Sequence, residues 1–307
     1  MSRRPLIVVA AFLLTVLASE ALVRTMSGAL PDPAPWPSNE TELKARQLEG
    51  EGYSIVFVGP SVTEAAVDPA LLTRLLGRET YSAATPYMSQ ASLHYWVERF
   101  VLPSTSPDLL VVGVPMWSPT FSSPSGEDPL FSALQEVEKF RRPETLWQRL
   151  RSASALLGWR EELKSAADLV VYERAPEDYG LWTSRGHQTL YYDGEISPFT
   201  PSWTNLSGRM DFSFLTLVSE LAASRGIRMA FLLEPSTCDA GGACLAPLDA
   251  VRLRQAYVEV AAQLGHPLLD IEGPFPQLWY ADPAHFNRQG TVAYTTKLAE
   301  ALQELGL

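Results

Sequence analysis

The sequence has little of what nucleic-acid, zinc and nucleotide sites require. Its 24 Lys and Arg face 35 Asp and Glu, a net charge of -11, and no basic cluster stands out, which argues against a nucleic-acid surface. It has two cysteines and four histidines, and no histidine lies near the cysteines, so we expect no zinc site. The segment GPSVTEAA, from residue 59, lacks the glycines and lysine of a phosphate-binding loop. These absences predict a site without metal or cofactor.

The N-terminus, residues 1–27, resembles an export signal. Arg3 and Arg4 precede an apolar run from Pro5 to Ala18, which is shorter than the roughly 20 residues that cross a bilayer. An uncleaved signal anchor is the preferred interpretation; a cleaved signal peptide and a buried helix are the alternatives. With the basic pair on the cytoplasmic side of a bacterial membrane, the rest of the chain would be periplasmic or extracellular, and secreted if the signal is cleaved.

Residues 28–48 are rich in proline and predict a linker that holds the following domain, 49–307, away from the membrane. No internal repeat or low-complexity tract follows this segment.

Both cysteines, Cys238 and Cys244, lie in the glycine-containing segment STCDAGGACLAP. In an oxidising compartment we expect them to form a disulfide, with free thiols as the alternative.

Short apolar runs alternate with longer helical patterns, which predicts an α/β fold. The runs 54–58 and 107–115 are rich in Leu and Val without polar alternation, as in parallel strands covered on both faces. Helices are expected at 68–78 and 91–101, then at 212–226, 248–265 and 288–305, and further strands at 227–235 and 267–271. Residues 120–205 interrupt this rhythm and predict an insertion with its own helices and an aromatic loop. That loop would pack on the core as a lid or stack on sugar rings.

Ser61 follows the first predicted strand, and Asp282 lies three residues before His285 in the segment WYADPAHFN. Hydrolysis by a serine needs a base to take its proton and an acid to orient that base, and His285 and Asp282 suit those roles. Of the four histidines, His94 lies within an apolar helix pattern, His266 precedes a proline at a strand entrance, and His187 lies in the aromatic loop without an acid at short spacing. His285 alone has a ready partner, Asp282. The alternative is that Ser61 and Asp282 merely cap helices and that His285 is exposed.

Together, the Gly59-Pro60-Ser61 turn and the C-terminal Asp-x-x-His resemble the SGNH, or GDSL-like, hydrolases, over about residues 53–116 and 208–305. The segments GPSVTEAAVDP and DPAHFNRQGTVAYTTKLAEAL are most similar to envelope members, such as the membrane-anchored relatives of DltD and the alginate acetylation proteins. The resemblance implies a flavodoxin-like three-layer α/β/α sandwich with a parallel sheet. It also implies acyl transfer by Ser61, His285 and Asp282.

The family's oxyanion hole usually adds a glycine amide and an asparagine side chain, and neither is plain in this sequence. Ala84 or Tyr87 stands at the glycine position, and Ser82 stands where an asparagine is common. Trp117 and Ser118 replace the third-block Gly-x-Asn, and the backbone amides of Ser61 and Ala84 are the expected oxyanion donors.

Three functions are open at this point. The first is a membrane-anchored serine esterase or O-acyltransferase acting on an acylated envelope polysaccharide or a similar ester. The second is a catalytically weak accessory or glycan-binding protein that partners with an integral-membrane acyltransferase, which the departures in the oxyanion blocks favour. The third is a structural envelope protein without a site. The complete set of Ser61, Asp282 and His285 favours the first.

Overall fold

The computed structural model describes residues 4–26, 41, 44–45, 47–49, 52–86, 88–117, 200–206, 210–239, 241–271 and 275–306, with scattered positions between 130 and 189. The insertion expected at about 120–205 therefore falls mostly outside the described residues, as do Tyr87 and Ser118.

Five parallel strands form the central sheet in the order β2-β1-β3-β7-β9. They are β1 (Ile55–Val58), β2 (Thr80–Ser82), β3 (Leu109–Val114), β7 (Arg228–Leu233) and β9 (Leu268–Leu269). Along the chain this is the 2-1-3-4-5 order of flavodoxin-like folds, in which sites form beyond the carboxyl ends of the strands, where the strand order reverses. The predicted parallel α/β fold is confirmed.

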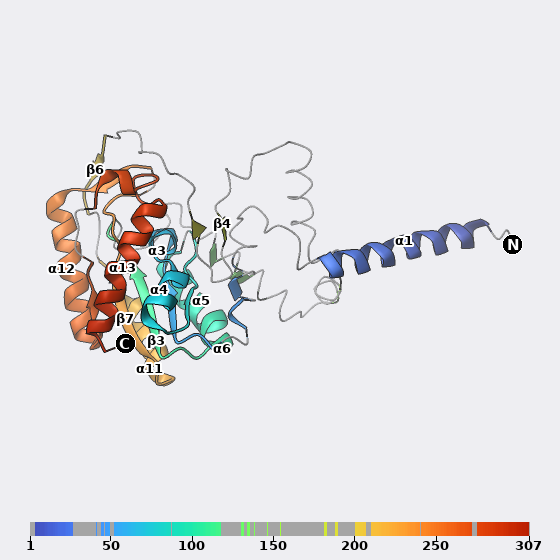
Figure 1. Cartoon of the computed structure of the whole chain (residues 1–307), viewed down its shortest axis with the longest axis horizontal. Coiled ribbons are helices and arrows are strands. Elements are labelled where there is room, and N and C mark those ends of the chain that lie inside the picture. The colour runs from blue at the N-terminus through green and yellow to red at the C-terminus, as the bar shows by residue number, and fades with distance from the viewer. Residues whose placement is uncertain are drawn as a thin grey trace.

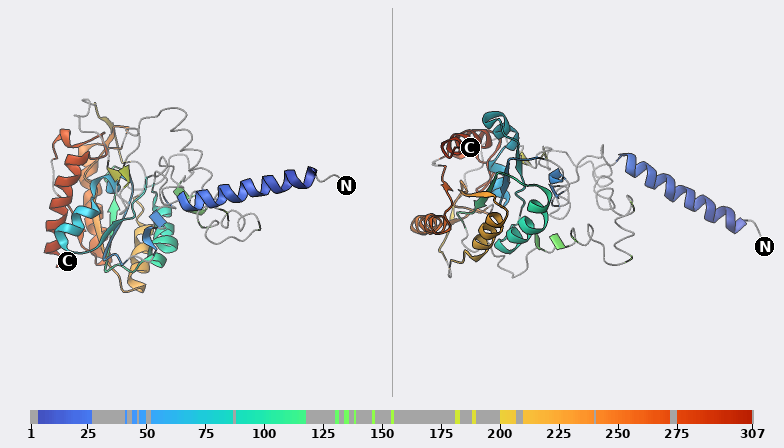
Figure 2. Two further views of the ribbon diagram at one scale, coloured as in Figure 1. Left: turned by 45° about the vertical axis from the view of Figure 1, so that its right-hand side comes forward. Right: turned by 90° about the horizontal axis from the view of Figure 1, so that it is seen from below.

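Helices cover both faces of the sheet, so the domain has three layers (Figures 1 and 2). Alternate residues of each strand point to opposite faces. Ile55 and Phe57 pack in one core cluster with residues of α4 and α13, whereas Val56 and Val58 belong to a second cluster with α5, α11 and α12. These helices are α4 (Pro69–Leu76), α5 (Gln90–Trp96), α11 (Ser213–Ser224), α12 (Pro247–Leu264) and α13 (Arg288–Glu304). A π-helical turn, η1 (Val97–Val101), and the short α6 (Leu102–Ser104) continue α5 toward β3.

Local signals in the sequence account for the helix that follows the candidate nucleophile. The Asp68 carboxylate accepts a hydrogen bond from the Leu71 amide at 3.0 Å, Pro69 occupies the first turn, and Gly77 ends α4 in the left-handed conformation at φ 65°. Aspartate at the N-cap and glycine just beyond the last turn are the residues that these positions favour.

Two minor sheets lie outside the central one. β6 (Ser202–Thr204) pairs in parallel with β8 (Ala243–Leu245), and β4 (Leu181–Trp182) pairs in antiparallel with β5 (Gln188–Thr189). β8 contains Cys244, which forms a disulfide with Cys238, so the first of these sheets is covalently linked to the loop that leaves β7.

The expected anchor segment forms α1 (Arg4–Met26), which extends away from the α/β domain (Figure 1). Large apolar side chains in its described part are exposed, among them Phe12 at 66%, Leu14 at 67% and Leu17 at 63%. Within the described residues, no helix combines the length and the hydropathy needed to span a membrane.

Part of the expected linker, residues 28–48, is buried. Thr41, Lys44, Ala45 and Leu48 are fully buried, and Ala45 and Leu48 belong to the core cluster on the α5 side of the sheet. These four buried residues therefore lie against the domain, although the sequence predicts them as part of the linker.

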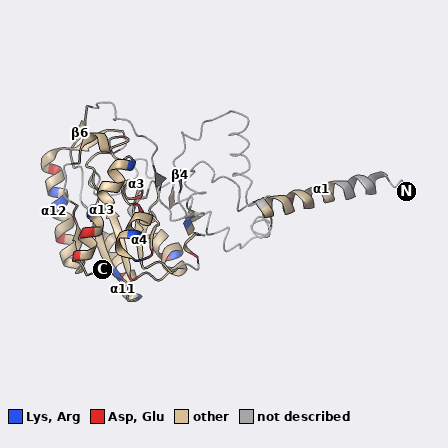
Figure 3. Cartoon of the chain, viewed as in Figure 1, with Lys and Arg blue, Asp and Glu red and all other residues tan. Residues whose placement is uncertain are grey.

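Residues of both charge signs are interspersed on the described helices rather than gathered by sign (Figure 3). Along α12, for example, Asp249 pairs with Arg252 and Arg254 pairs with Asp270 of the following segment.

Candidate active site

Ser61 is presented by the turn that leaves β1, which lies between β2 and β3 in the sheet. Gly59 and Pro60 end the strand, and Ser61 is the first residue of the short helix α3 (Ser61–Ala66). The N-cap of α3 is Pro60, and no side chain caps this helix. The Ser61 hydroxyl lies 2.8 Å from Nε2 of His285. The structure thus gives Ser61 a hydrogen bond to an imidazole and not the capping role considered as its alternative.

His285 and Asp282 complete a chain of hydrogen bonds with Ser61. Nδ1 of His285 lies 2.8 Å from Oδ2 of Asp282. A carboxylate accepts but does not donate, so this contact favours the tautomer in which Nδ1 carries the proton and Nε2 is left to accept from Ser61. The cap of α13 is Asn287, whose Oδ1 accepts from the Gly290 amide at 3.1 Å, so Asp282 is not the helix cap.

The environment of Asp282 keeps its carboxyl ionised. Burial raises its pKa, but the hydrogen bond and the charge of His285 lower it, together with the backbone amides of Ala284 and His285, and the net pKa lies below the usual value. Those two amides donate to Oδ1 at 2.8 and 2.9 Å, while Oδ2 remains directed at the imidazole. An ionised carboxylate in this position orients the imidazole and stabilises the imidazolium that forms when the serine loses its proton.

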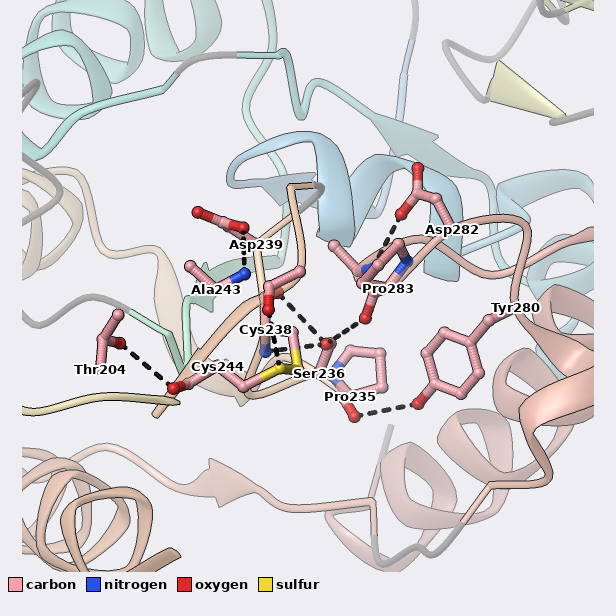
Figure 4. The surroundings of a disulfide bond; sticks show 12 residues. Thr204, Pro235, Ser236, Cys238, Asp239, Ala243, Cys244, Tyr280, Asp282 and Pro283 are labelled. Carbon is pink, nitrogen blue, oxygen red and sulfur yellow. Dashed lines mark hydrogen bonds between the residues drawn. A yellow bond between two sulfur atoms is a disulfide. The ribbon is translucent and has the colours of Figure 1, made fainter. Parts of the chain in front are cut away.

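The loop that carries Asp282 and His285 is tied to the loop after β7 (Figure 4). The Ser236 hydroxyl donates to the Pro283 carbonyl at 2.9 Å, and the Tyr280 hydroxyl donates to the Pro235 carbonyl at 3.2 Å. Ser236 Oγ also accepts from the Cys238 amide at 3.1 Å. Cys238 and Cys244 form a disulfide that closes the segment between them. Ser236 therefore connects this closed segment to the loop that carries Asp282 and His285.

A buried carboxyl, that of Glu234, forms hydrogen bonds with α3, the helix that begins with Ser61. Glu234, at the carboxyl end of β7, is 4% exposed, and its Oε1 accepts from the Thr63 amide at 3.2 Å and from the Thr63 hydroxyl at 2.7 Å. The close approach of Thr63 to the sheet requires glycine in β3, because a Cβ at Gly113 would lie 1.8 Å from the Thr63 Oγ1. The sequence pattern did not single out Glu234, since its partner is 171 residues away.

Several buried polar atoms at the carboxyl ends of the strands lack a hydrogen-bond partner in the described part of the chain. They are the Thr85 and Ser82 hydroxyls, the Trp117 indole Nε1 and the Glu234 Oε2. Thr85 and Trp117 follow β2 and β3, the two strands that flank β1, and Glu234 follows β7. Unpaired buried polar groups are rare in folded proteins and are often functional, so their gathering at this edge of the sheet favours a binding site there.

Of the oxyanion donors expected from the sequence, Ser61 begins α3 and Ala84 is fully buried after β2, where its carbonyl accepts from Lys44. The oxyanion roles of the Ser61 and Ala84 amides remain predictions.

A second serine–histidine pair lies elsewhere in the domain. Ser219 on α11 approaches Nε2 of His266 at 2.6 Å, and burial lowers the pKa of this histidine. No hydrogen bond or ion pair described for His266 involves a carboxylate, in contrast to His285. No group of three or more possible metal ligands occurs among the residues that the structure describes.

Among known proteins, only solved structures resemble this chain. No protein-family model matches the sequence, and no curated protein matches it. A candidate SGNH hydrolase from Slackia heliotrinireducens is 16% identical, with a TM-score of 0.41 over 82% of this chain and 100% of its own. A candidate acylhydrolase from Bacteroides fragilis is 12% identical, with a TM-score of 0.46 over 88% and 98%. A GDSL-like lipase from Bacteroides thetaiotaomicron is 11% identical, with a TM-score of 0.38 over 94% and 98%. These scores are low, so the interpretation of the site rests on the distances between Ser61, His285 and Asp282.

Proposed function

We propose that this chain is a serine ester hydrolase of the SGNH type. The observation that carries the proposal is the unbroken chain of hydrogen bonds from the Ser61 hydroxyl through His285 to Asp282, with 2.8 Å at each step. A hydroxyl, an imidazole and an ionised carboxylate in this order are the groups that acyl transfer through a serine requires.

In the proposed reaction, Ser61 Oγ attacks the carbonyl carbon of an ester while Nε2 of His285 takes the hydroxyl proton. The tetrahedral oxyanion then collapses, the ester C–O bond breaks, and His285 returns the proton to the departing alcohol. Water attacks the resulting acyl-serine with His285 as base, which releases a carboxylic acid and restores Ser61. If a sugar hydroxyl replaces water in this second half, the same residues perform O-acyl transfer.

We further propose that the domain acts outside the cytoplasm, on an O-acylated envelope glycan or a similar ester, while anchored by α1. The exposed side chains of Phe12, Leu14 and Leu17 support an apolar environment for this helix, because water is a poor solvent for so many clustered apolar groups. The Cys238–Cys244 disulfide supports an oxidising compartment. An integral-membrane acyltransferase is the partner that such a location would offer.

Covalent labelling tests the proposed function. The full-length chain in mild detergent is treated with a fluorophosphonate, in which Ser61 Oγ would displace fluoride from phosphorus, and the product is read by intact mass and peptide mapping. We expect one adduct at Ser61 that is lost in Ser61→Ala and strongly reduced in His285→Ala. Ser219→Ala serves as the matched control, because Ser219 also contacts a histidine but lacks the carboxylate.

A wild-type chain that is folded and remains unlabelled would contradict the proposal and would favour a binding or accessory role. A labelled chain that transfers an acyl group from an ester to a sugar faster than to water would assign it to O-acyl transfer instead of hydrolysis.

Trp117 is expected to supply an oxyanion donor where the family usually has an asparagine. Its indole N–H is buried without a partner among the described residues, and it lies three residues after β3, the neighbour of the strand that presents Ser61. Trp117→Phe keeps the aromatic ring but removes this N–H. We expect kcat for an activated ester to fall by about 100-fold with little change in KM, because the lost bond forms mainly in the transition state.

Trp203→Phe is the control for this substitution, since Trp203 lies on β6 and is 61% exposed. A Trp117→Phe enzyme that keeps kcat within twofold of the wild type would show that Nε1 does not contact the oxyanion.

A further inference from the structure

Lys44 is a charged residue in the interior of the domain, and its burial there has to be explained. It is fully buried, and its ammonium donates to the Glu64 carboxylate and to the Ala84 carbonyl. Removing a charge from water is costly, and a buried ion pair is often no more stabilising than apolar residues of similar volume. A gain in folding stability therefore does not explain why a lysine is buried here. The positions of its two partners, Glu64 and Ala84, suggest another role.

Both partners belong to segments that frame the candidate nucleophile. Glu64 lies in α3, three residues after Ser61, so it is in the same short helix. Ala84 lies in the chain that leaves β2, and the next residue, Thr85, donates its amide hydrogen to the Gly59 carbonyl at 2.9 Å. Gly59 is two residues before Ser61. The Lys44 ammonium thus joins α3, the helix that begins with Ser61, to the segment that follows β2.

The neighbouring contacts make this junction rigid. The Trp96 indole donates to the Ala83 carbonyl at 2.8 Å, and the Ala83 amide donates to the Phe57 carbonyl at 2.7 Å. The Tyr81 hydroxyl contacts the Lys44 carbonyl at 3.3 Å and the Gln47 side chain at 2.9 Å. The backbone around Lys44 is therefore fixed to β2, and its side chain extends from there to α3.

We propose that Lys44 is a positioning residue for the active site, whose ammonium sets the spacing between the helix that begins with Ser61 and the chain that leaves β2. This inference rests on the proposed function for its catalytic consequence. The segment between α1 and the domain would then be more than a spacer, because it supplies a side chain that holds the site together.

Substitution of both partners separates positioning from folding. Lys44→Met alone leaves the Glu64 carboxylate buried without this cation and is expected to destabilise the fold. The double variant Lys44→Met/Glu64→Met replaces the pair with apolar groups of similar volume, and we expect it to fold with a melting temperature close to that of the wild type. Lys297→Met, which removes an exposed lysine of α13, is the matched control.

Two readouts decide the proposal in the full-length chain. In the double variant we expect kcat for an activated ester to fall by about 10- to 100-fold with KM nearly unchanged, because small displacements of reacting groups are costly. We also expect amide exchange in peptides covering 82–88 and 59–66 to be about 10-fold faster than in the wild type and in Lys297→Met.

Unchanged exchange in a folded double variant would overturn the proposal, whatever the activity. Faster exchange together with a kcat within twofold of the wild type would also overturn it, since the spacing would then not matter for the reaction. If the wild type proves inactive while exchange in the double variant is faster, the proposed function fails but the role of Lys44 in holding the two segments is supported.

Discussion

Replacing Asp282 with asparagine is expected to lower kcat for ester hydrolysis by about 10⁴-fold. The asparagine side chain can keep an oxygen for the amides of Ala284 and His285, which donate to Oδ1. Its NH₂ group would then face Nδ1 of His285, where the carboxylate oxygen now accepts a hydrogen bond. The imidazole would have to accept at Nδ1 and carry its proton on Nε2, so it could no longer take the proton of Ser61.

The measurement compares kcat and KM of wild type and Asp282→Asn on an activated ester, with circular dichroism to show that both are folded. Asp270→Asn is the control, because Asp270 pairs with Arg254 at the surface of the domain. A loss of less than tenfold in Asp282→Asn would show that Asp282 does not set the tautomer of His285, and the site would have to be interpreted as a serine–histidine dyad.

Replacing Glu234 with glutamine is expected to make the domain much less sensitive to alkaline pH. Burial raises the pKa of Glu234 from 4.5 to about 8, although the two hydrogen bonds from Thr63 lower it. Tyr257 and Tyr294, whose hydroxyls donate to the carbonyls of Pro115 and Leu233, are buried nearby, and the charge of Glu234 contributes to their raised pKa. A protonated carboxyl is therefore the form that the fold accommodates.

The direction of the pH effect follows from proton binding. Between pH 4.5 and about pH 8 the folded state retains a proton on Glu234 that the unfolded chain releases. The stabilisation is fully present below pH 4.5 and is lost as pH rises toward 8, at about 1.4 kcal/mol per pH unit. Glutamine has no proton to lose, so this part of the pH dependence should vanish in Glu234→Gln.

Urea unfolding of wild type and Glu234→Gln at half-unit steps from pH 5 to pH 9 measures the difference. We expect the variant to become progressively more stable relative to the wild type as the pH rises. Glu220→Gln, which alters an exposed carboxyl on α11, should follow the wild type. Parallel stability curves for Glu234→Gln and the wild type would show that Glu234 is ionised in the fold, which would require a partner for its second oxygen.

The layers of the fold could be predicted from the sequence because they depend on local patterns. The Leu- and Val-rich run at 109–114 is buried at every position, as expected for a strand covered on both faces. The Asp68 cap and the glycine at 77 delimit α4 within two residues of the predicted helix. The burial of Thr41, Lys44, Ala45 and Leu48 was not predicted, because nothing local in ETELKARQL distinguishes a linker from a buried segment.

Some residues of the candidate site could likewise be predicted from local patterns, and others could not. Ser61, Asp282 and His285 were identifiable because a strand-end turn and an Asp-x-x-His spacing are short patterns, even though 224 residues separate the serine from the histidine. Glu234 and Lys44 were not identifiable. Each contacts α3 from a distant segment, and a lone glutamate or lysine in a sequence is more often a surface residue than a buried support.

The packing of Gly113 against Thr63 also has an evolutionary consequence. With a Cβ at position 113 lying 1.8 Å from the Thr63 hydroxyl oxygen, a larger residue at 113 and a threonine at 63 exclude each other in this backbone. Thr63 in turn is the donor to Glu234. Among relatives of this chain, the three positions should therefore vary together: lineages that replace the glycine should also have lost the threonine, and with it the reason to retain the buried glutamate.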